Sequence, residues 1–113
     1  MGIQKLLDLK HRIDYVELKK KSFFDTKDRR IVDVSVIIPV RGRSEFNRIV
    51  SSYLFEAIKC SNIKVSVTFV EHSITREHEH LCDTWVNYIH IPLGGGVFNK
   101  SMCQNFGALY SNT

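Results

Sequence analysis

The sequence predicts an α/β fold in which a mostly parallel, open sheet is flanked by helices. β-Branched apolar runs alternate along the chain with stretches whose apolar residues recur at helical spacing. Parallel strands must be joined by crossover connections, which are usually helices. Strands covered on both faces are almost wholly apolar, as residues 34–40 are. With 113 residues, the chain is long enough for one core of this kind.

Residues 1–30 are predicted to form a helical N-terminal arm and a connector, ahead of a main domain of residues 31–113. Within residues 3–20, apolar side chains recur at spacings near three and four, which favours an amphipathic helix over a strand. These side chains are Ile3, Leu6, Leu7, Ile13 and Val16. Residues 22–30 are polar and lack periodicity, so we expect them to connect the arm to the main domain.

The main domain is predicted to open with a strand, a tight turn and a helix. Residues 34–40 predict a central parallel strand, which Pro39 closes at its carboxyl end. Arg41, Gly42 and Arg43 form the predicted turn, and Ser44 is the expected N-cap of the helix. Apolar residues at helical spacing extend that helix to residue 57.

Two further strands and a final helix are predicted to follow. Residues 63–70 alternate apolar with polar side chains, which indicates a strand with one less buried face. Residues 74–83 are polar and could hold a helical turn, and residues 85–91 form the third strand, closed by Pro92. After a flexible glycine turn at 94–96, Asn99 is the expected cap of a helix to about Tyr110. Its predicted inner side chains are Met102, Phe106, Leu109 and Tyr110.

Polar side chains follow each of the three predicted strands. They are Arg41 and Arg43, then Glu71, His72 and Ser73, then Asn99 and Lys100 beside Phe98. The carboxyl ends of parallel strands meet at one edge, where open α/β sheets bind ligands. Guanidinium groups suit the negative charge of a diphosphate, and the N-terminus of the final helix also attracts anions. The alternative is that the arginines are exposed loop charges and that Phe98 is a core aromatic.

Two motifs in this chain resemble those of a known enzyme family. The string from Val34 to Arg43, and Phe98–Ser101 followed by Asn105–Ala108, resemble paired motifs of inverting GT-A glycosyltransferases. The nearest likeness is to the galactosyltransferase-like and family 2 group, in which a Pro-x-Arg-x-Arg loop precedes a Phe-Asn-Arg-like helix start. The resemblance covers the chain from Val34 onward. It implies the Rossmann-like half of a GT-A domain, which would bind a nucleotide sugar, a UDP-sugar in particular.

The resemblance also implies a role for individual residues. The implied nucleotide-sugar-binding residues are Pro39, Val40, Arg41, Arg43, Glu71, Phe98, Asn99 and Lys100. The first four would line the base and ribose, with one of the two arginines also meeting the diphosphate, and Glu71 would meet the base or ribose. Where the family pattern usually has arginine, this chain has Lys100, which can meet a phosphate as a point charge but lacks arginine's planar fork.

The same resemblance implies that this chain contains neither the catalytic residue nor the metal ligands. In the family, an Asp-x-Asp pair on the next strand holds Mn²⁺ or Mg²⁺ against the diphosphate, and the catalytic carboxylate follows later. The chain ends at Thr113. We therefore expect it to be inactive alone, and we expect hexosyltransferase activity and the metal only of a longer protein.

A second hypothesis is a non-catalytic, self-associating interaction module that keeps this fold. A half-domain leaves an unpaired sheet edge, and an unpaired edge invites pairing with another chain. Both hypotheses therefore predict a homo-oligomer.

Nucleic acid and membranes are not expected partners. Nine of the sixteen Lys and Arg residues fall in the first thirty positions, but five acidic residues are interleaved and no aromatic stacking platform accompanies them. No apolar run approaches the roughly 20 residues that a membrane span needs. Cys60, Cys82 and Cys103 are odd in number and far apart, which predicts reduced core thiols in a cytoplasmic protein.

One stretch carries side chains of the kind that bind zinc. Residues 77–80 read Glu-His-Glu-His, and His72 and Cys82 are near them in the sequence. The spacing is not that of an established structural zinc site. We therefore interpret residues 77–80 as a solvated polar loop.

Overall fold

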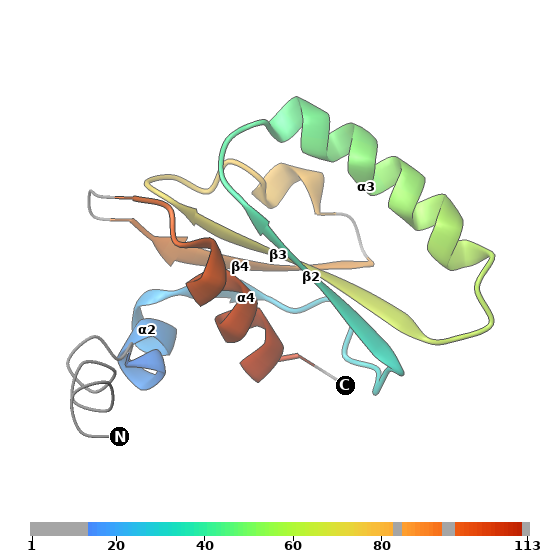
Figure 1. The fold of residues 1–113 in the computed structure, drawn as a ribbon, viewed down its shortest axis with the longest axis horizontal. Helices are drawn as coiled ribbons and strands as arrows, with labels where there is room; N and C mark the ends of the chain where they lie inside the picture. Colours follow the sequence, from blue (N-terminus) through green and yellow to red (C-terminus); the bar gives the residue numbers. More distant parts are fainter. Residues whose placement is uncertain (1–13, 83–84, 94–96, 112–113) are drawn as a thin grey trace, which may run out of the picture.

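The computed structural model describes residues 14–82, 85–93 and 97–111 (Figure 1). In chain order its elements are α2 (Tyr15–Lys21), β1 (Phe23–Asp25), β2 (Val34–Val40), α3 (Ser44–Lys59), β3 (Val65–Ser73), the short 3₁₀ helix η1 (Glu79–Leu81), β4 (Val86–Pro92) and α4 (Lys100–Leu109). The predicted α/β class and the helical turn within residues 74–83 are confirmed. Most of the expected helix over residues 3–20 lies outside the described residues, and α2 is its described part.

The four strands form one mixed sheet, in the order β1-β4-β3-β2. β2, β3 and β4 run parallel, whereas β1 pairs antiparallel with β4. The prediction of a mostly parallel sheet is therefore corrected, because residues 23–25 form an edge strand where a connector was expected. Three residues are too few to show the alternating pattern of a strand in the sequence. These residues form a strand because they pair with β4.

Helices cover both faces of the sheet (Figure 1). On the α3 face, the buried cluster consists of Val40, Val67, Phe69, Cys82, Val86 and Tyr88. On the face covered by α4 and α2, it consists of Val70, Ile89, Ile91, Met102, Cys103 and Phe106. β3 and β4 contribute to both clusters, so the centre of the fold lies on these two strands.

The expectation of a less buried face on the second parallel strand is wrong. Ser66 and Thr68 are only 1% and 5% exposed. The hydroxyls of Ser66 and Ser35 hydrogen-bond at 3.0 Å, which satisfies both groups within the packed layers. The polar residues that alternate with apolar ones in this strand are therefore buried in the packed layers and are not exposed to water.

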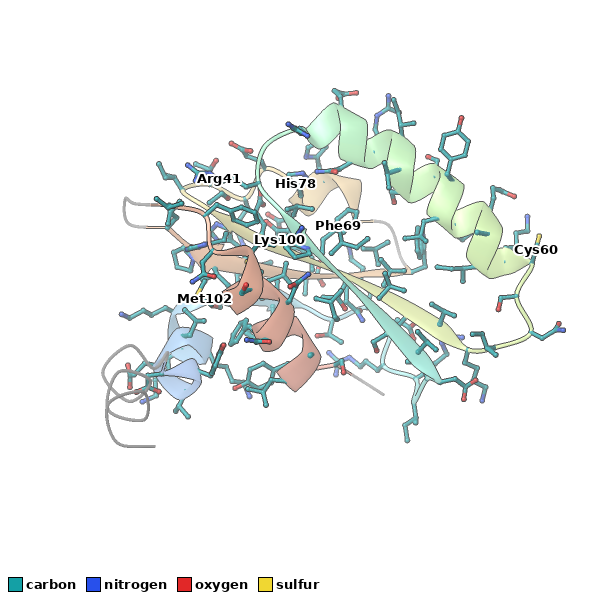
Figure 2. The ribbon with its side chains drawn as sticks, viewed as in Figure 1. Arg41, Cys60, Phe69, His78, Lys100 and Met102 are labelled. Atoms are coloured by element: carbon teal, nitrogen blue, oxygen red, sulfur yellow. The ribbon has the colours of Figure 1, made fainter. Side chains whose placement is uncertain are left out.

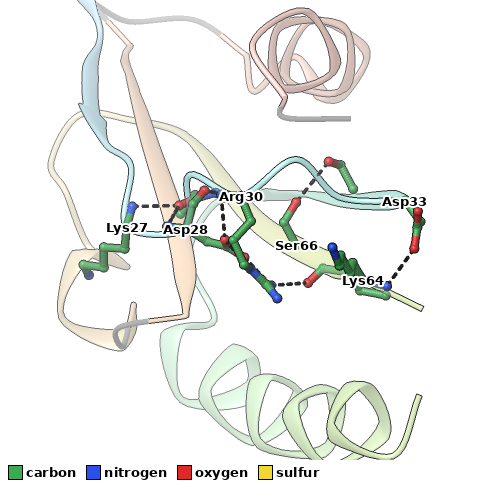
Figure 3. Close-up of polar contacts among 9 residues, drawn as sticks. Lys27, Asp28, Arg30, Asp33, Lys64 and Ser66 are labelled. Carbon is green, nitrogen blue, oxygen red and sulfur yellow. Dashed lines mark hydrogen bonds and ion pairs between the residues drawn. The ribbon is translucent and has the colours of Figure 1, made fainter. Parts of the chain in front are cut away.

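Polar contacts tie the connection between β1 and β2 to the amino ends of the parallel strands (Figure 3). The side-chain oxygen of Asn87 accepts from the backbone N–H groups of Lys27 and Asp28, both at 2.8 Å. Arg30 forms an ion pair with Asp28 at 2.7 Å and donates to the carbonyl of Val65 at 3.2 Å. The hydrogen bond from the Arg30 guanidinium lowers the pKa of Asp28, despite burial that raises it.

The two long helices begin differently. The side chain of Asn99 accepts from the backbone N–H of Met102 at 2.9 Å, as predicted for the cap of α4. Ser44 is the first residue of α3 rather than its cap, and Arg43 takes the cap position with no side-chain capping bond. On α4, Leu109 was expected to face inward but is 58% exposed.

The three cysteines differ in burial. Cys82 and Cys103 are buried as expected, whereas Cys60 is exposed at the end of α3. Burial raises the pKa of the Cys103 thiol to about 12, which keeps it protonated and unreactive. No helix in the described segments is long and apolar enough to cross a membrane.

Gly107 allows α4 to lie directly on the sheet. A Cβ at this position would lie 2.4 Å from Cγ2 of Ile37 and 3.0 Å from Cγ2 of Val70. Both atoms belong to β-branched side chains of the packed sheet, which have little freedom to move away. Only glycine therefore permits this helix–sheet distance.

We expect Gly107→Ala to destabilise the protein by about 1–3 kcal/mol through overpacking, although alanine gains about 1 kcal/mol in helix propensity. The exposed residue Gln104, also on α4, gives a matched control as Gln104→Ala. Urea unfolding of the three proteins measures the difference. A Gly107→Ala variant as stable as the control would show that the contact is loose.

Candidate functional site

The candidate site lies at the carboxyl ends of the three parallel strands. The register places Val40 opposite Glu71, and Glu71 opposite His90. Arg41, His78 and Lys100 lie toward this end of the sheet, whereas Cys60 lies at the far end of α3 (Figure 2). The parallel part of the sheet therefore brings the ends of three strands, and the polar segments that follow them, to one edge.

A buried hydrogen-bond network, centred on Glu71, lies beneath this edge. Glu71, His78 and Tyr88 are each 0% exposed. One carboxylate oxygen of Glu71 lies 2.7 Å from Nδ1 of His78. The other accepts from the hydroxyl of Tyr88 at 2.5 Å and from the backbone N–H of His78 at 3.1 Å. Both oxygens of the carboxylate thus have protein donors.

Asn47 extends the network from the sheet to the loop after β2. Its side-chain nitrogen lies 2.7 Å from Nε2 of His78 and donates to the carbonyl of Gly42 at 3.3 Å. An imidazole with its hydrogen on Nδ1 satisfies both neighbours, because it donates to Glu71 and accepts from Asn47. We call Tyr88, Glu71, His78 and Asn47 the Glu71 network.

The electrostatics of the network favour the charged form of the Glu71 carboxylate. Burial raises the pKa of Glu71, but the hydrogen bonds from His78 and Tyr88 outweigh it, and the pKa falls below its ordinary value. Burial and the adjacent carboxylate raise the pKa of Tyr88 far above its ordinary value, so the phenol keeps its proton. Because the folded pKa of Glu71 is depressed, its charge stabilises the fold above the unfolded pKa. That contribution is lost as the pH falls through the folded pKa.

The turn above the network has an uncommon backbone. Gly42 has φ 64° and Arg43 has φ 56°, so two successive residues lie in the left-handed region. A residue with a Cβ seldom adopts this conformation. The turn delivers the chain into α3, where the N–H of Asn47 donates to the carbonyl of Arg43 at 2.9 Å. Arg41 and Arg43 flank Gly42, and both are exposed.

A second set of contacts joins the end of β3 to the start of α4. The backbone N–H of Asn99 donates to Nδ1 of His72 at 3.1 Å, and the rings of His72 and Phe98 lie 6.2 Å apart. Burial, and then the positive charges of Arg41 and His90, lower the pKa of His72. His72 therefore contacts the start of α4 and is also close enough to Arg41 for the charge of Arg41 to affect its pKa. The loop after β2 and the start of α4 thus both lie near His72.

The predicted site residues divide by exposure. Arg41, Arg43, Asn99 and Lys100 are exposed, Pro39 and Phe98 are partly buried, and Val40 and Glu71 are buried. The Val40 side chain packs in the core on the α3 face. The four exposed residues offer their side chains at the surface, whereas Glu71 is enclosed by the network beneath them.

Tyr88 and Asn47 carry no functional expectation from the sequence, and His78 was weighed only as a zinc ligand within residues 77–80 and set aside. The interpretation of residues 77–80 as a solvated loop is wrong for His78, which is fully buried. The sequence holds a partial signal, since Glu71 ends an apolar strand and Tyr88 is an inward position of the next strand. Nothing in the sequence indicates that residue 78 folds back to meet residue 71.

Three side chains could in principle hold a metal ion. Ligand atoms of Glu71, Glu77 and His78 lie within 4.8 Å of one another. However, both oxygens of Glu71 and both ring nitrogens of His78 already have protein partners. An ion would have to replace the Glu71–His78 hydrogen bond. We therefore interpret the group as a hydrogen-bonded network rather than a metal centre.

Comparison with known proteins assigns no family. No protein-family model matches the sequence, and neither a curated protein nor a solved structure matches the chain. Function is therefore inferred from the geometry and charge of the sheet edge.

We expect Tyr88→Phe to destabilise the protein by about 1.5–3 kcal/mol, because a buried charge loses one of its donors. Tyr53, which is 75% exposed, gives the matched control Tyr53→Phe, expected to change stability by less than about 0.5 kcal/mol. Urea unfolding should also show the Tyr88→Phe deficit shrinking in acid, because protonated Glu71 no longer carries the charge that the phenol stabilises. A deficit that is equal for the two variants would contradict the network.

Proposed function

We propose that residues 31–113 form the nucleotide-sugar-binding half of a glycosyltransferase-like domain, and that a UDP-sugar binds at the carboxyl edge of the sheet. In this proposal, the parallel unit of β2, β3 and β4 with the crossover helix α3 corresponds to the Rossmann-like half of a GT-A fold. Open α/β sheets bind ligands at this edge. We propose binding, and not sugar transfer, as the property of the described residues.

The observation that carries this proposal is that an exposed cationic turn and the start of α4 lie at the same edge of the sheet. Arg41 and Arg43 project from a turn whose backbone is held by Asn47. Lys100 opens α4, whose N-terminus carries a partial positive charge. A diphosphate carries the complementary negative charge, and guanidinium groups bind it through paired hydrogen bonds.

Roles within the proposed site follow exposure. Arg41 and Arg43 would contact the diphosphate, with Lys100 adding a point charge. Phe98 is partly exposed beside His72 and offers a ring edge to the base or sugar. Glu71 supports the site from beneath, because its oxygens already accept from His78 and Tyr88. A few such contacts would give roughly millimolar affinity, about 4 kcal/mol.

Arg41→Ala is expected to weaken UDP binding at least about tenfold, since a lost hydrogen bond to a charged group is worth about 1.5–3 kcal/mol. Arg29→Ala is the matched control, because Arg29 is also exposed but lies in the connection between β1 and β2. Isothermal titration calorimetry with UDP measures both. The proposal fails if the wild-type protein gives no heat at several millimolar UDP, or if the two variants bind alike.

A second candidate function is self-association through the outer edge of β2. In the described part of the sheet, β2 is a terminal strand with a neighbour on one side only. The N–H of Val34 donates to Lys64, toward β3, so by the two-residue period the backbone groups of Ile37 and Pro39 face outward. Pro39 has no N–H, which leaves the amino-terminal half of β2 as the part suited to pairing. Ile31, Val34 and Ile63 are exposed near that half.

If this edge pairs with a second copy, Val34→Lys should shift the protein from dimer to monomer, because an edge lysine opposes strand addition. Ile74→Lys is the control, since Ile74 is 74% exposed in the loop after β3. Sedimentation velocity over a range of concentrations distinguishes the outcomes. A wild-type protein that is monomeric at every concentration would exclude self-association.

A further inference from the structure

We propose that Asn47 and His78 are positioning residues, which hold the Arg41–Arg43 turn in the conformation that binds an anionic diphosphate. The Glu71 network would thereby set the affinity of the site without contacting the ligand. The identity of the ligand rests on the proposed function above. The positioning of the turn by the network rests only on contacts within the protein.

The Glu71 network is continuous from the sheet to the turn. Tyr88 lies on β4, Glu71 on β3, His78 after the loop that follows β3, and Asn47 in the first turns of α3. Each member contacts the next at 2.5–2.7 Å, and Asn47 then reaches the carbonyl of Gly42 at 3.3 Å. The network therefore runs from two neighbouring strands, β4 and β3, to the loop after β2.

The side-chain amide of Asn47 can bond to His78 and to the turn at the same time. A side-chain amide has two N–H donors, and here one faces His78 and the other faces Gly42. In a neutral imidazole whose Nδ1 hydrogen is donated to Glu71, Nε2 is the acceptor that faces Asn47. The buried carboxylate thus determines that the hydrogen of the imidazole is on Nδ1. The imidazole in turn determines that the amide nitrogen of Asn47 faces Nε2.

The backbone of the turn has a conformation that needs support. Arg43 has φ 56°, a conformation that a residue with a side chain keeps only when its surroundings impose it. The bond from Asn47 to the carbonyl of Gly42 acts on the peptide group directly before Arg43. Without that bond, Arg43 can relax to a more common conformation, and the directions of the Arg41 and Arg43 side chains change with it.

A purely structural role for the network is the competing account. Buried polar groups must satisfy one another whatever lies above them. Under that account, Asn47 substitutions would lower stability and would affect ligand binding equally with or without the arginines. Under ours, the effect of Asn47 on binding passes through the turn, so it depends on Arg43.

The test is a double-mutant cycle on UDP affinity with Asn47→Leu, Arg43→Ala and the double variant in the full chain. Leucine has the same branched skeleton of heavy atoms as asparagine and carries no charge, so it removes the donors without adding electrostatic repulsion. We expect Asn47→Leu to weaken UDP binding about tenfold in the wild-type background and only about threefold in the Arg43→Ala background, where Arg41 alone remains to be positioned. Equal losses in the two backgrounds would overturn the proposal. Asn105→Leu, at an exposed position within α4, is the matched control.

The backbone of Arg43 gives a second measurement that needs no ligand. NMR chemical shifts and couplings report its φ in the wild type and in Asn47→Leu, with Asn47→Ala as a second variant if leucine prevents folding. Loss of the positive φ supports the positioning role, and an unchanged φ overturns it. If the wild type does not bind UDP, the proposed function fails, while the conformation of Arg43 still decides whether the network positions the turn.

Discussion

The carboxyl edge of the sheet depends on one requirement, that the buried carboxylate of Glu71 be supplied with donors. An isolated carboxylate in a protein interior is very costly, and it must be paired or become protonated. Here His78 and Tyr88 provide three hydrogen bonds, and the pKa of Glu71 lies below its ordinary value rather than above it. The cost of burial is offset only while these partners keep their places.

That requirement constrains much of the neighbouring structure. The loop after β3 must fold back so that both the ring and the backbone N–H of His78 reach Glu71. α3 must start where Asn47 can meet His78, which fixes the length and shape of the Arg41–Arg43 turn. The positive φ of Arg43 lies in the turn that connects β2 to α3. The network thus links the packing of the sheet to the presentation of two surface arginines.

Much of the fold could be predicted from the sequence, because the apolar periods of β2, β3, β4, α3 and α4 are long and clear. β1 could not, since three residues carry no period and its partner, β4, lies more than sixty residues away. The burial of both faces of β3 was also missed, because Ser66 and Thr68 are satisfied within the layers and still look like surface residues in the sequence.

The sequence pointed to the exposed part of the candidate site and to Glu71, but not to the partners of Glu71. Strand-end positions pointed to Arg41, Arg43, Asn99 and Lys100, which lie at the surface near one edge. The buried part depends on tertiary contacts: residue 78 meets residue 71 through a loop, and residue 47 meets residue 78 across the α3 face. Neither pairing has a local sequence pattern, which is why residues 77–80 were interpreted as a polar loop and Asn47 was not singled out.

The central claim is that this edge of the sheet binds a nucleotide diphosphate above the Glu71 network. The most direct measurement is a titration of the ¹⁵N-labelled protein with UDP, followed by amide chemical shifts. The account predicts saturable shifts, in roughly the millimolar range, at Arg41, Gly42, Arg43 and Lys100, with smaller shifts along α2 and at the far end of α3. An absence of shifts at several millimolar UDP, or shifts confined to the basic α2 segment, would contradict it.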